Sequence, residues 1–542
     1  MKGMVTHMEF DPIKYNYPSR RHAIFARNIV ATSNPLAAQA GLDIMRRGGN
    51  AIDAAVATAA ALAVMEPTAN GIGGDAFAIV WADGKLHGLN ASGYAPATLS
   101  VDALKKQGIK EMPAYSWEAV TVPGAPSAWA ALSGKFGALP FASLLQPAAN
   151  YARHGYPVSV DVGDKWARAY KLYKSVFLGE MYKGWFETFT PTGRSPAPGD
   201  VFQSTDMADT LEKLAETCCE DFYRGEIARN IVSFAQKYGG YLQESDLAEY
   251  YPEWVSPISI NYKGYDVHEI PPNGQGLAAL IALNLLKGLE INEHRETERN
   301  YHLQIEAMKL AFADAEAYIA DARHMDIGVE ELLSDAYADE RRTLIGERAA
   351  IYKHGTPQRG GTVYLATADA SGNMVSYIQS NYQGFGSGLV VPGRGIALHN
   401  RGNNFNLIEG HPNCLAPRKK PYHTIIPGFL TKSGLPIGPF GVMGAFMQPQ
   451  AHVQVISSTI DCRLNPQDTL DAPRWQWKQG KSIFLEDGVP PEIIERLAER
   501  GHDITVLSDY TSMGRGQIIW SMPNGVYCAG TEPRTDGTIA CY

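Results

Sequence analysis

The sequence predicts an α+β protein built in layers. Helical patterns dominate residues 100–290, and a long helical pattern with one apolar face follows at residues 296–320. From residue 362 onward, strand-like segments alternate with glycine and proline turns. The chain has 542 residues, 45% of them hydrophobic and 19% charged, so it can bury a large core.

The first part of the chain contains a short strand and two helices. The strand is expected at residues 28–33, and a helix starts at residue 34 and stops at the glycine pair 48–49. The next helix, residues 51–65, carries small apolar residues on nearly every side, so we expect it to be buried. Residues 1–27 are polar and aromatic and are expected on the surface.

A glycine-rich turn at residues 71–74 follows this helix and precedes a strand at residues 76–81. A dinucleotide-binding loop follows a strand and opens a helix, which is the opposite order, and no Gly-Lys-Ser/Thr sequence is present. A nucleotide-binding enzyme that uses residues 71–74 is kept as an alternative, and thermal stabilisation by a nucleotide would favour it.

The remaining helices and strands are predicted from the helical period of about 3.6 residues and the strand period of two residues. Residues 344–361 show little pattern and are predicted to form a mobile linker. Further helices are expected at 207–217, 226–238, 276–286, 449–460, 465–472 and 491–501, and further strands at 395–399, 424–430 and 437–442.

The most informative stretch is a predicted hairpin that begins with a threonine. Two glycines precede Thr362, which opens a strand whose even-numbered and odd-numbered residues face opposite sides. Residues 369–373 form the turn, and residues 374–379 return. The simplest interpretation is an ordinary Gly-Gly turn before a strand.

A threonine in this place also has a chemical use. A threonine hydroxyl is a weak nucleophile until a base removes its proton. Cleavage before Thr362 would free its α-amine, whose ordinary pKa of about 7.7–8.0 suits a base near neutral pH. Glycines 360 and 361 would let the uncut peptide bend so that the Thr362 hydroxyl reaches the Gly361 carbonyl.

A family resemblance supports the chemical interpretation. The stretch GTVYLATAD at residues 361–369, Gly-Asn at 372–373 and GFGSG at 384–388 resemble the start of the small subunit of γ-glutamyltranspeptidases. These are N-terminal-nucleophile hydrolases that cut themselves before a threonine, and the resemblance extends over residues 28–537. It implies a four-layer αββα sandwich.

The resemblance also implies a division of the chain at the Gly361–Thr362 bond. Residues 1–361 would be a helix-rich large subunit on one side of the sandwich, and residues 362–542 a strand-rich small subunit that carries the nucleophile. The two would form one compact heterodimer, with further dimerisation left open.

The resemblance assigns four catalytic positions. Thr362 matches the nucleophile, and Ser380 matches a second hydroxyl that contacts it. Gly444 matches the first glycine of a turn whose N–H groups hold the oxyanion, and Ala445 stands at the second glycine. Alanine keeps the N–H, so the oxyanion hole survives if the backbone tolerates a Cβ.

The expected substrate-binding residues depart from the family. Ser92 stands in place of an arginine that binds the glutamate α-carboxylate, whereas Arg401 and Asn404 occupy the places of groups that bind the α-ammonium. Tyr382 replaces an asparagine. Arginine attracts carboxylates and repels ammonium groups. The residues that bind the glutamate α-carboxylate and α-ammonium in the family are therefore predicted to be replaced here.

Residues 421–424 replace a segment with paired serines, and His423 and Thr424 are also predicted to bind substrate. A structural role for His423 is equally open. The sequence therefore predicts hydrolysis of a small carboxylate-bearing amide such as oxamate. The alternatives are a γ-glutamyl hydrolase or transpeptidase, a cephalosporin or glutaryl acylase, and an inactive binding protein. The short link 406–421 leaves little room for a lid, which favours water as acceptor.

Composition excludes several partners. The net charge of −9 and the lack of a long basic run argue against nucleic acid. The six cysteines have no metal-site spacing, so free thiols and no metal or other cofactor are expected. Residues 1–27 lack the apolar core of a secretory signal, and residues 51–65 contain Asp53 and are too short to span a bilayer. A cytoplasmic protein without a membrane partner is expected.

Overall fold

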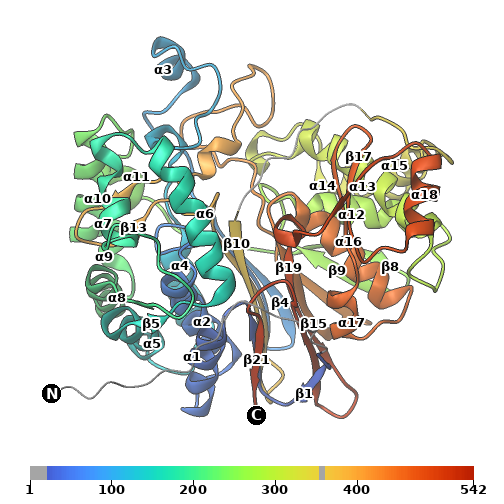
Figure 1. Ribbon diagram of the computed structural model, residues 1–542, viewed down its shortest axis with the longest axis horizontal. Coiled ribbons are helices and arrows are strands. Elements are labelled where there is room, and N and C mark those ends of the chain that lie inside the picture. The colour runs from blue at the N-terminus through green and yellow to red at the C-terminus, as the bar shows by residue number, and fades with distance from the viewer. Residues whose placement is uncertain (1–20, 353–360) are drawn as a thin grey trace.

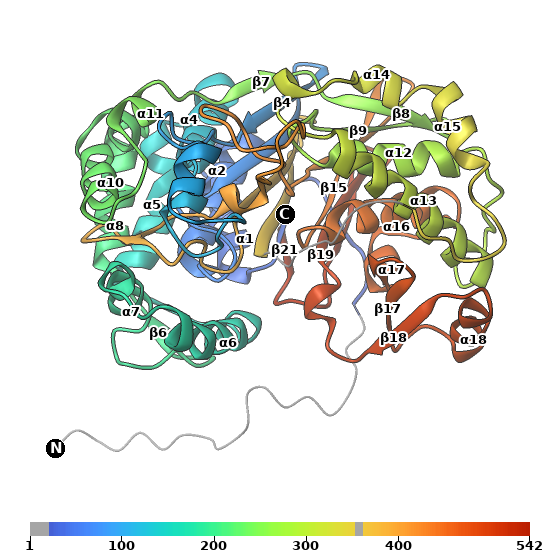
Figure 2. The ribbon, with the colours of Figure 1, turned by 90° about the horizontal axis from the view of Figure 1, so that it is seen from above.

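The computed structural model describes residues 21–352 and 361–542. Part of the expected linker, residues 353–360, lies outside the described residues, as do residues 1–20. Two seven-stranded antiparallel sheets stack in the centre, and helices cover the outer face of each (Figure 1). This is the predicted four-layer αββα arrangement. The view from above shows the two helical layers on opposite sides of the sheets (Figure 2).

The sheet that carries Thr362, here called the nucleophile sheet, has the order β21-β2-β10-β11-β3-β4-β7. Its strands are β2 (Ile29–Thr32), β3 (Asp75–Ala82), β4 (Lys85–Ala91), β7 (Glu253–Val255), β10 (Gly361–Ala368), β11 (Met374–Tyr382) and β21 (Thr538–Cys541). The predicted hairpin is therefore present as β10 and β11.

The second sheet has the order β1-β20-β19-β15-β14-β9-β8. Its strands are β1 (Ile24–Ala26), β8 (Ile258–Tyr262), β9 (Tyr265–Glu269), β14 (Gly428–Lys432), β15 (Leu435–Met443), β19 (Arg515–Ser521) and β20 (Tyr527–Thr531). Residues before and after position 361 contribute strands to both sheets. The prediction that residues 1–361 lie on one side of the sandwich is therefore wrong, because these residues contribute strands to both sheets.

Within residues 21–352 and 361–542, three smaller sheets lie outside the two central ones. They are formed by β5 (Tyr156–Pro157) with β6 (Val201–Phe202), by β12 (Val390–Val391) with β13 (Ile396–Ala397), and by β16 (Trp475–Gln479), β17 (Ser482–Glu486) and β18 (Asp503–Leu507).

The helical layer on the nucleophile sheet is drawn from the first half of the chain (Figure 1). Its helices are α1 (Pro35–Arg46), α2 (Ala51–Met65), α4 (Ala125–Phe136), α5 (Phe141–His154), α6 (Val160–Val176), α7 (Lys183–Phe189), α8 (Thr205–Thr217), α9 (Glu220–Arg224), α10 (Glu226–Lys237) and α11 (Glu244–Ala248), with α3 (Val101–Lys106) projecting beside them.

The helical layer on the second sheet combines segments from both sides of position 361. Its helices are α12 (Gly276–Leu286), α13 (Glu298–Tyr318), α14 (Val329–Leu332), α15 (Asp335–Arg342), α16 (Met447–Ile460), α17 (Pro466–Asp471) and α18 (Pro491–Glu499). Within the described residues, no helix combines the length and the apolar character needed to cross a lipid bilayer.

The alternation predicted for the strand after Thr362 is confirmed by its two neighbouring cores. Val363 and Leu365 pack into the core beneath the first helical layer. Tyr364 and Ala366 pack into the core between the two sheets. The hairpin is thus buried on both faces, which restricts its movement.

The buried helix α2 has the bounds that the sequence predicted, because its ends are encoded locally. The Asn50 side chain accepts hydrogen bonds from the N–H groups of Ile52 and Asp53, and the Asp53 carboxylate accepts one from the Asn50 N–H, which makes a capping box. Every residue of α2 is buried, as the small-residue pattern indicated.

Other helix and strand boundaries differ from the prediction because tertiary contacts compete with the local sequence pattern. The strand expected at 424–430 starts only at Gly428, because the preceding backbone pairs irregularly. The His423 N–H donates to the Asn273 carbonyl at 2.9 Å, and the Gln275 N–H donates to the His423 carbonyl at 2.9 Å. All six cysteines are free, as expected.

A buried ionic network joins the outer three-stranded sheet to the second sheet. The Glu532 carboxylate accepts hydrogen bonds from Arg474 at 2.7 Å and Arg534 at 2.8 Å, and from the Gly516 N–H at 2.7 Å. Burial alone would raise the pKa of Glu532, but the two guanidinium groups outweigh it and hold the pKa below its ordinary value. Its stabilising contribution is present above the unfolded-state pKa and is lost as the pH falls through the lower folded-state pKa.

We predict that Glu532→Gln lowers the free energy of unfolding by about 3–5 kcal/mol, because it removes the carboxylate that pairs with the buried Arg474 guanidinium. The measurement is urea unfolding at pH 7. Glu409→Gln is the matched control, since Glu409 pairs with Lys105 at the exposed surface, and it should change stability little. Equal stability of the two variants would contradict the prediction.

Candidate active site

Thr362 lies at an irregularity of the β10–β11 hairpin. Gly361 pairs with Tyr382 and Val363 pairs with Gln379, so the register shifts by one residue at Thr362. Such bulges re-aim side chains and are common beside active sites. Thr362 is 2% exposed, yet it lines a cavity.

The predicted partner hydroxyl is next to it. The Thr362 hydroxyl donates a hydrogen bond to the Ser380 Oγ at 3.1 Å, and the Tyr382 N–H donates to the same Oγ at 2.8 Å. Tyr382 has a φ of 74°, a left-handed conformation that is unusual for a bulky residue. The turn after Ser380 is therefore strained where it supports the nucleophile.

The predicted oxyanion turn connects β15 to α16. Gly444 has a φ of 143° and lines the same cavity as Thr362. Ala445 has a φ of 52° and is buried, so the backbone there does accommodate a Cβ, at the cost of a left-handed conformation. Across the residues that the structure describes, no acceptor is recorded for either N–H. Both remain available as donors.

The cavity beside Thr362 has a volume of about 580 Å³ and an excess of positive charge. Four cationic side chains line it, against one carboxylate, Asp509. The cations are Lys165, Arg168, Lys478 and Arg515. A pocket of this size suits a small organic molecule, and its charge favours an anion.

Lys165 and Arg515 meet inside this wall through Asp161. Lys165 donates to the Asp161 carboxylate at 2.5 Å, and Arg515 lies 3.2 Å from it. Burial, followed by the charge of Arg515, lowers the pKa of Lys165. The sequence pattern did not predict that these residues line the site. The only local signal was the three-residue spacing of Lys165 and Arg168 along α6, which does not indicate what the helix faces.

Arg401, predicted to bind a substrate carboxylate, does not line the Thr362 cavity. It is fully buried and donates to the Thr424 hydroxyl at 2.7 Å, with Nε 3.7 Å from the Asp75 carboxylate. Its guanidinium also lies 4.5 Å from the centre of the Tyr382 ring. Arg401, Thr424 and Tyr382 thus meet in one buried cluster around Asp75.

His423 belongs to the same cluster. Its Nε2 and the Asp75 carboxylate are 2.9 Å apart, and both side chains are fully buried. Burial raises the pKa of Asp75 to about 7 against the effect of Arg401, and burial lowers the pKa of Arg401 to about 10. Burial, with the nearby Arg401 charge, also holds the pKa of His423 well below its ordinary range. His423 is therefore neutral. Its contacts favour the structural alternative, and a substrate-binding role remains a prediction.

Asn404 lies elsewhere, in a second cavity of about 680 Å³. Its amide donates to the Tyr422 carbonyl at 3.0 Å. Phe446, which follows Ala445, lines both this cavity and the Thr362 cavity. The structure therefore brings Thr362, Ser380 and Gly444 together. The five predicted substrate-binding residues are not among those that line the Thr362 cavity.

The glycine-rich turn at residues 71–74 is occupied by backbone packing. The His399 N–H donates to the Gly73 carbonyl at 3.0 Å, and the Gly124 N–H donates to the Gly74 carbonyl at 2.9 Å. A Cβ at Gly74 would lie 2.7 Å from the Ser380 carbonyl oxygen. The glycines serve close packing behind the nucleophile, which argues against the nucleotide alternative.

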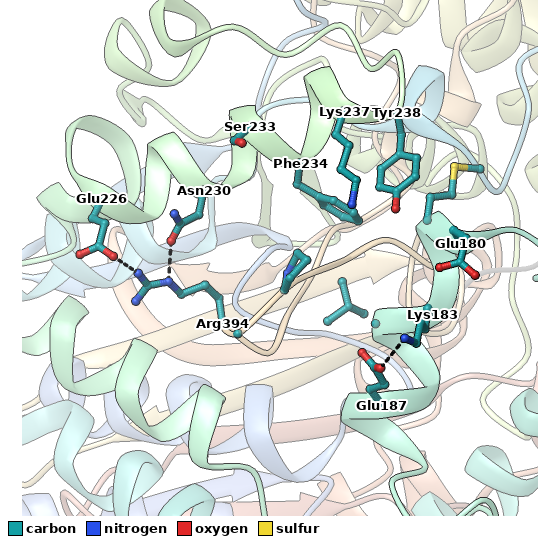
Figure 3. A pocket seen from close by; sticks show the side chains of 15 residues that line it. Glu180, Lys183, Glu187, Glu226, Asn230, Ser233, Phe234, Lys237, Tyr238 and Arg394 are labelled. Atoms are coloured by element: carbon teal, nitrogen blue, oxygen red, sulfur yellow. Dashed lines mark hydrogen bonds and ion pairs between the residues drawn. The ribbon is translucent and has the colours of Figure 1, made fainter.

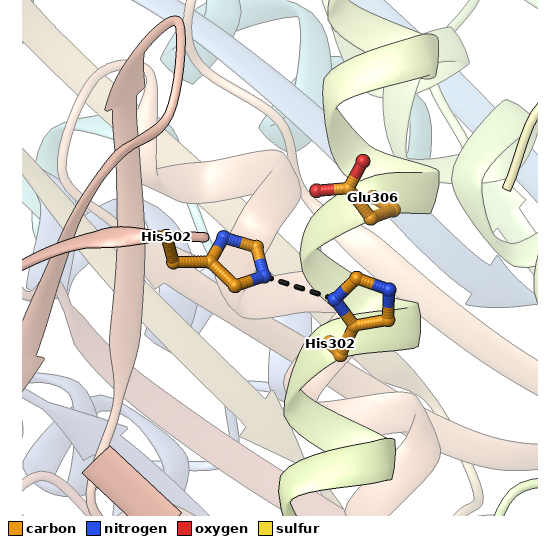
Figure 4. Close-up of side chains that lie close together, drawn as sticks. All are labelled: His302, Glu306 and His502. Carbon is orange, nitrogen blue, oxygen red and sulfur yellow. Dashed lines mark hydrogen bonds between the residues drawn. The ribbon is translucent and has the colours of Figure 1, made fainter. Parts of the chain in front are cut away.

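His302, Glu306 and His502 form a buried cluster of metal-ligand types (Figure 4). Most of their polar atoms are engaged in hydrogen bonds: His302 Nδ1 lies 2.9 Å from His502 Nε2, and Lys309 donates to Glu306 at 2.6 Å. The Lys309 ammonium beside Glu306 would also oppose a divalent cation. The same cluster binds the chain before the linker, since Glu306 accepts from the Ala350 N–H at 3.1 Å.

A groove of about 590 Å³ lies on the first helical layer, and its lining among the described residues does not include Thr362 (Figure 3). Its Arg394 is held by Glu226 and by Asn230, the latter at 2.7 Å, and Lys183 pairs with Glu187 at 3.4 Å. These internal pairs leave the Thr362 cavity as the better candidate active site.

A threonine at the start of a strand within an αββα sandwich defines an N-terminal-nucleophile hydrolase. The family model described as gamma-glutamyltranspeptidase matches residues 37–542. The chain belongs to the γ-glutamyltranspeptidase family and is an amide hydrolase.

Several relatives span nearly the whole chain. A glutathione hydrolase-like YwrD proenzyme of Bacillus subtilis is 35% identical, covering 95% of this chain and 99% of its own. An oxamate amidohydrolase proenzyme of Klebsiella pneumoniae is 34% identical, covering 94% and 97%. The crystal structure of a cephalosporin acylase from Bacillus halodurans is 58% identical, with a TM-score of 0.96 and 99% of each chain covered.

We predict that Ala445→Val lowers both the melting temperature and the hydrolysis rate, whereas Ala445→Gly keeps both. A β-branched residue in a left-handed conformation costs about 1–3 kcal/mol and would displace the Ala445 N–H, which lies between the cavity-lining residues Gly444 and Phe446. Thermal unfolding and amide hydrolysis are the measurements.

Ser433→Val is the matched control, because Ser433 has a φ of 51° in an exposed turn away from the cavity. It should lower the melting temperature without lowering activity. If Ala445→Val were as active as wild type, the oxyanion assignment would be wrong.

Proposed function

We propose that this protein is a self-processing threonine amidohydrolase that hydrolyses amides with a carboxylate-bearing acyl group. The observation that carries the proposal is the hydrogen bond of 3.1 Å between the Thr362 and Ser380 hydroxyls, in the wall of the cavity that Gly444 also lines. The relatives named as proenzymes support processing.

Cleavage of the Gly361–Thr362 bond would leave a large fragment, 1–361, and a small fragment, 362–542. The freed α-amine of Thr362 takes the proton of its own hydroxyl, and the Oγ attacks the substrate carbonyl. The N–H groups of Gly444 and Ala445 stabilise the oxyanion. The amine product leaves with that proton, and water then releases the acyl group from Thr362.

The cavity supports an acyl group with a carboxylate, because Lys165, Arg168, Lys478 and Arg515 surround it. Oxamate, the example that the sequence suggested, satisfies this charge, and the Klebsiella pneumoniae relative is named for it. A cavity of about 580 Å³ exceeds what so small a molecule fills. Size and the similarity to the cephalosporin acylase structure therefore favour a longer dicarboxylic acyl chain on a larger amine.

A γ-glutamyl substrate is less well supported. Its α-ammonium needs an acidic partner, and Asp509 in the cavity wall is already 3.0 Å from Arg168. An inactive binding protein with the same fold would keep an uncut chain, which an intact-mass measurement detects.

We predict that the purified protein consists of two fragments with a new N-terminus at Thr362, and that Thr362→Ala remains one uncut chain. Intact-mass measurement checks this. Removing the nucleophile should lower amide hydrolysis by about 10³-fold or more. Thr362→Ser is the matched variant, because it keeps a hydroxyl and should still be cut. An uncut wild type would overturn the proposal.

We predict that Lys165→Gln raises the KM for an N-glutaryl amide about tenfold or more, because a hydrogen-bonded charge is lost from the acyl site. The N-pentanoyl analogue, which lacks the terminal carboxylate, should be unaffected. Lys183→Gln is the control, since Lys183 is exposed and pairs with Glu187. A similar change for both acyl groups would show that Lys165 acts only through structure.

A further inference from the structure

The second cavity, here called the aromatic chamber, adjoins the Thr362 cavity at Phe446. Phe312, Tyr422, Phe446 and Trp477 line it. The Tyr422 and Phe446 rings stack with centres 5.9 Å apart, and the Phe312 and Trp477 rings stack at 5.7 Å. Most of this wall is rigid, because Phe312, Tyr422 and Trp477 are each less than 10% exposed.

The charge of the aromatic chamber is opposite to that of the Thr362 cavity. Its lining contains Glu316 and Glu409 and, among the described residues, neither lysine nor arginine. Glu409 is exposed, where it pairs with Lys105, whereas Glu316 is half-buried. Glu316 is therefore the carboxylate nearer the interior. Glu316 lies one turn after Phe312 on α13, on the same face of that helix.

The aromatic chamber is also connected to the oxyanion turn. The Tyr422 hydroxyl donates to the Gln275 side-chain oxygen at 3.2 Å. The Gln275 amide donates to the Ala445 carbonyl at 2.8 Å. Phe446 follows Ala445 in the chain. A group bound in the chamber would therefore contact residues that position the reacting carbonyl.

We propose that the aromatic chamber binds the amine half of the substrate, and that this half is an aromatic or aliphatic amine that carries a cationic group. A cation is attracted by aromatic ring faces and by the Glu316 carboxylate. The substrate is then bipolar, with its anionic acyl end among the cations beside Thr362 and its cationic amine end beyond Phe446. This proposal rests on the proposed function and names the leaving group for the same site.

Three N-glutaryl anilides with the same acyl group test the proposal. Their para substituents are trimethylammoniomethyl, its neutral isostere neopentyl, and the anionic sulfonatomethyl. Wild type should hydrolyse the cationic anilide with a kcat/KM about tenfold above the neutral one and further above the anionic one. Equal values for the three would overturn the proposal while leaving the proposed function intact.

Glu316→Gln identifies the group responsible. It should lower kcat/KM for the cationic anilide about tenfold and leave the neutral anilide and self-cleavage unchanged. Glu180→Gln, on the groove of Figure 3, is the control. Equal losses with all three anilides would indicate a structural effect and refute the role of Glu316. A self-cleaved protein that hydrolyses none of them would instead refute the proposed substrate class.

Discussion

The position of Thr362 depends on how the β10–β11 hairpin is anchored at its other end. The Ala51 N–H donates to the Asp369 carboxylate at 2.8 Å, and the Thr367 hydroxyl donates to the Ala51 carbonyl at 2.7 Å. The Tyr527 hydroxyl donates to the Asp369 carbonyl at 2.8 Å. One turn is thereby tied to a buried helix and to the second sheet.

The irregular backbone geometry lies at the opposite end of the hairpin, which carries Thr362. The register shift lies at Thr362, which lines the cavity, and the left-handed Tyr382 and Ala445 are each next in the chain to a residue that lines it. Each is unfavourable by itself, and each persists because tightly packed elements surround it. In this way the fold keeps a hydroxyl, a partner hydroxyl and two N–H donors in fixed relation.

Charge is distributed unevenly around the nucleophile, and this distribution shapes the substrate proposal. Arg401 and Asp75 lie in the interior, where each stabilises the ionised form of the other. Lys165 and Arg515 border the cavity, where a substrate can meet them. The acyl end of the proposed substrate would therefore meet positive charge from α6 and β19, whereas Arg401 packs against the Tyr382 ring in the interior.

Local sequence determined the features that depend on neighbours along the chain. These are the capped helix α2, the hairpin turn and the two faces of β10, whereas the pairing of Thr362 with Ser380 was predicted from the family resemblance. The start of β14 was missed because the backbone at His423 pairs with Asn273 and Gln275, roughly 150 residues earlier in the chain, a contact that periodicity does not encode. Only the tertiary structure decided which charges face Thr362. Lys165 and Arg515 come from segments far from Thr362 on either side, and packing and desolvation of their side chains, rather than local spacing, place them in one wall.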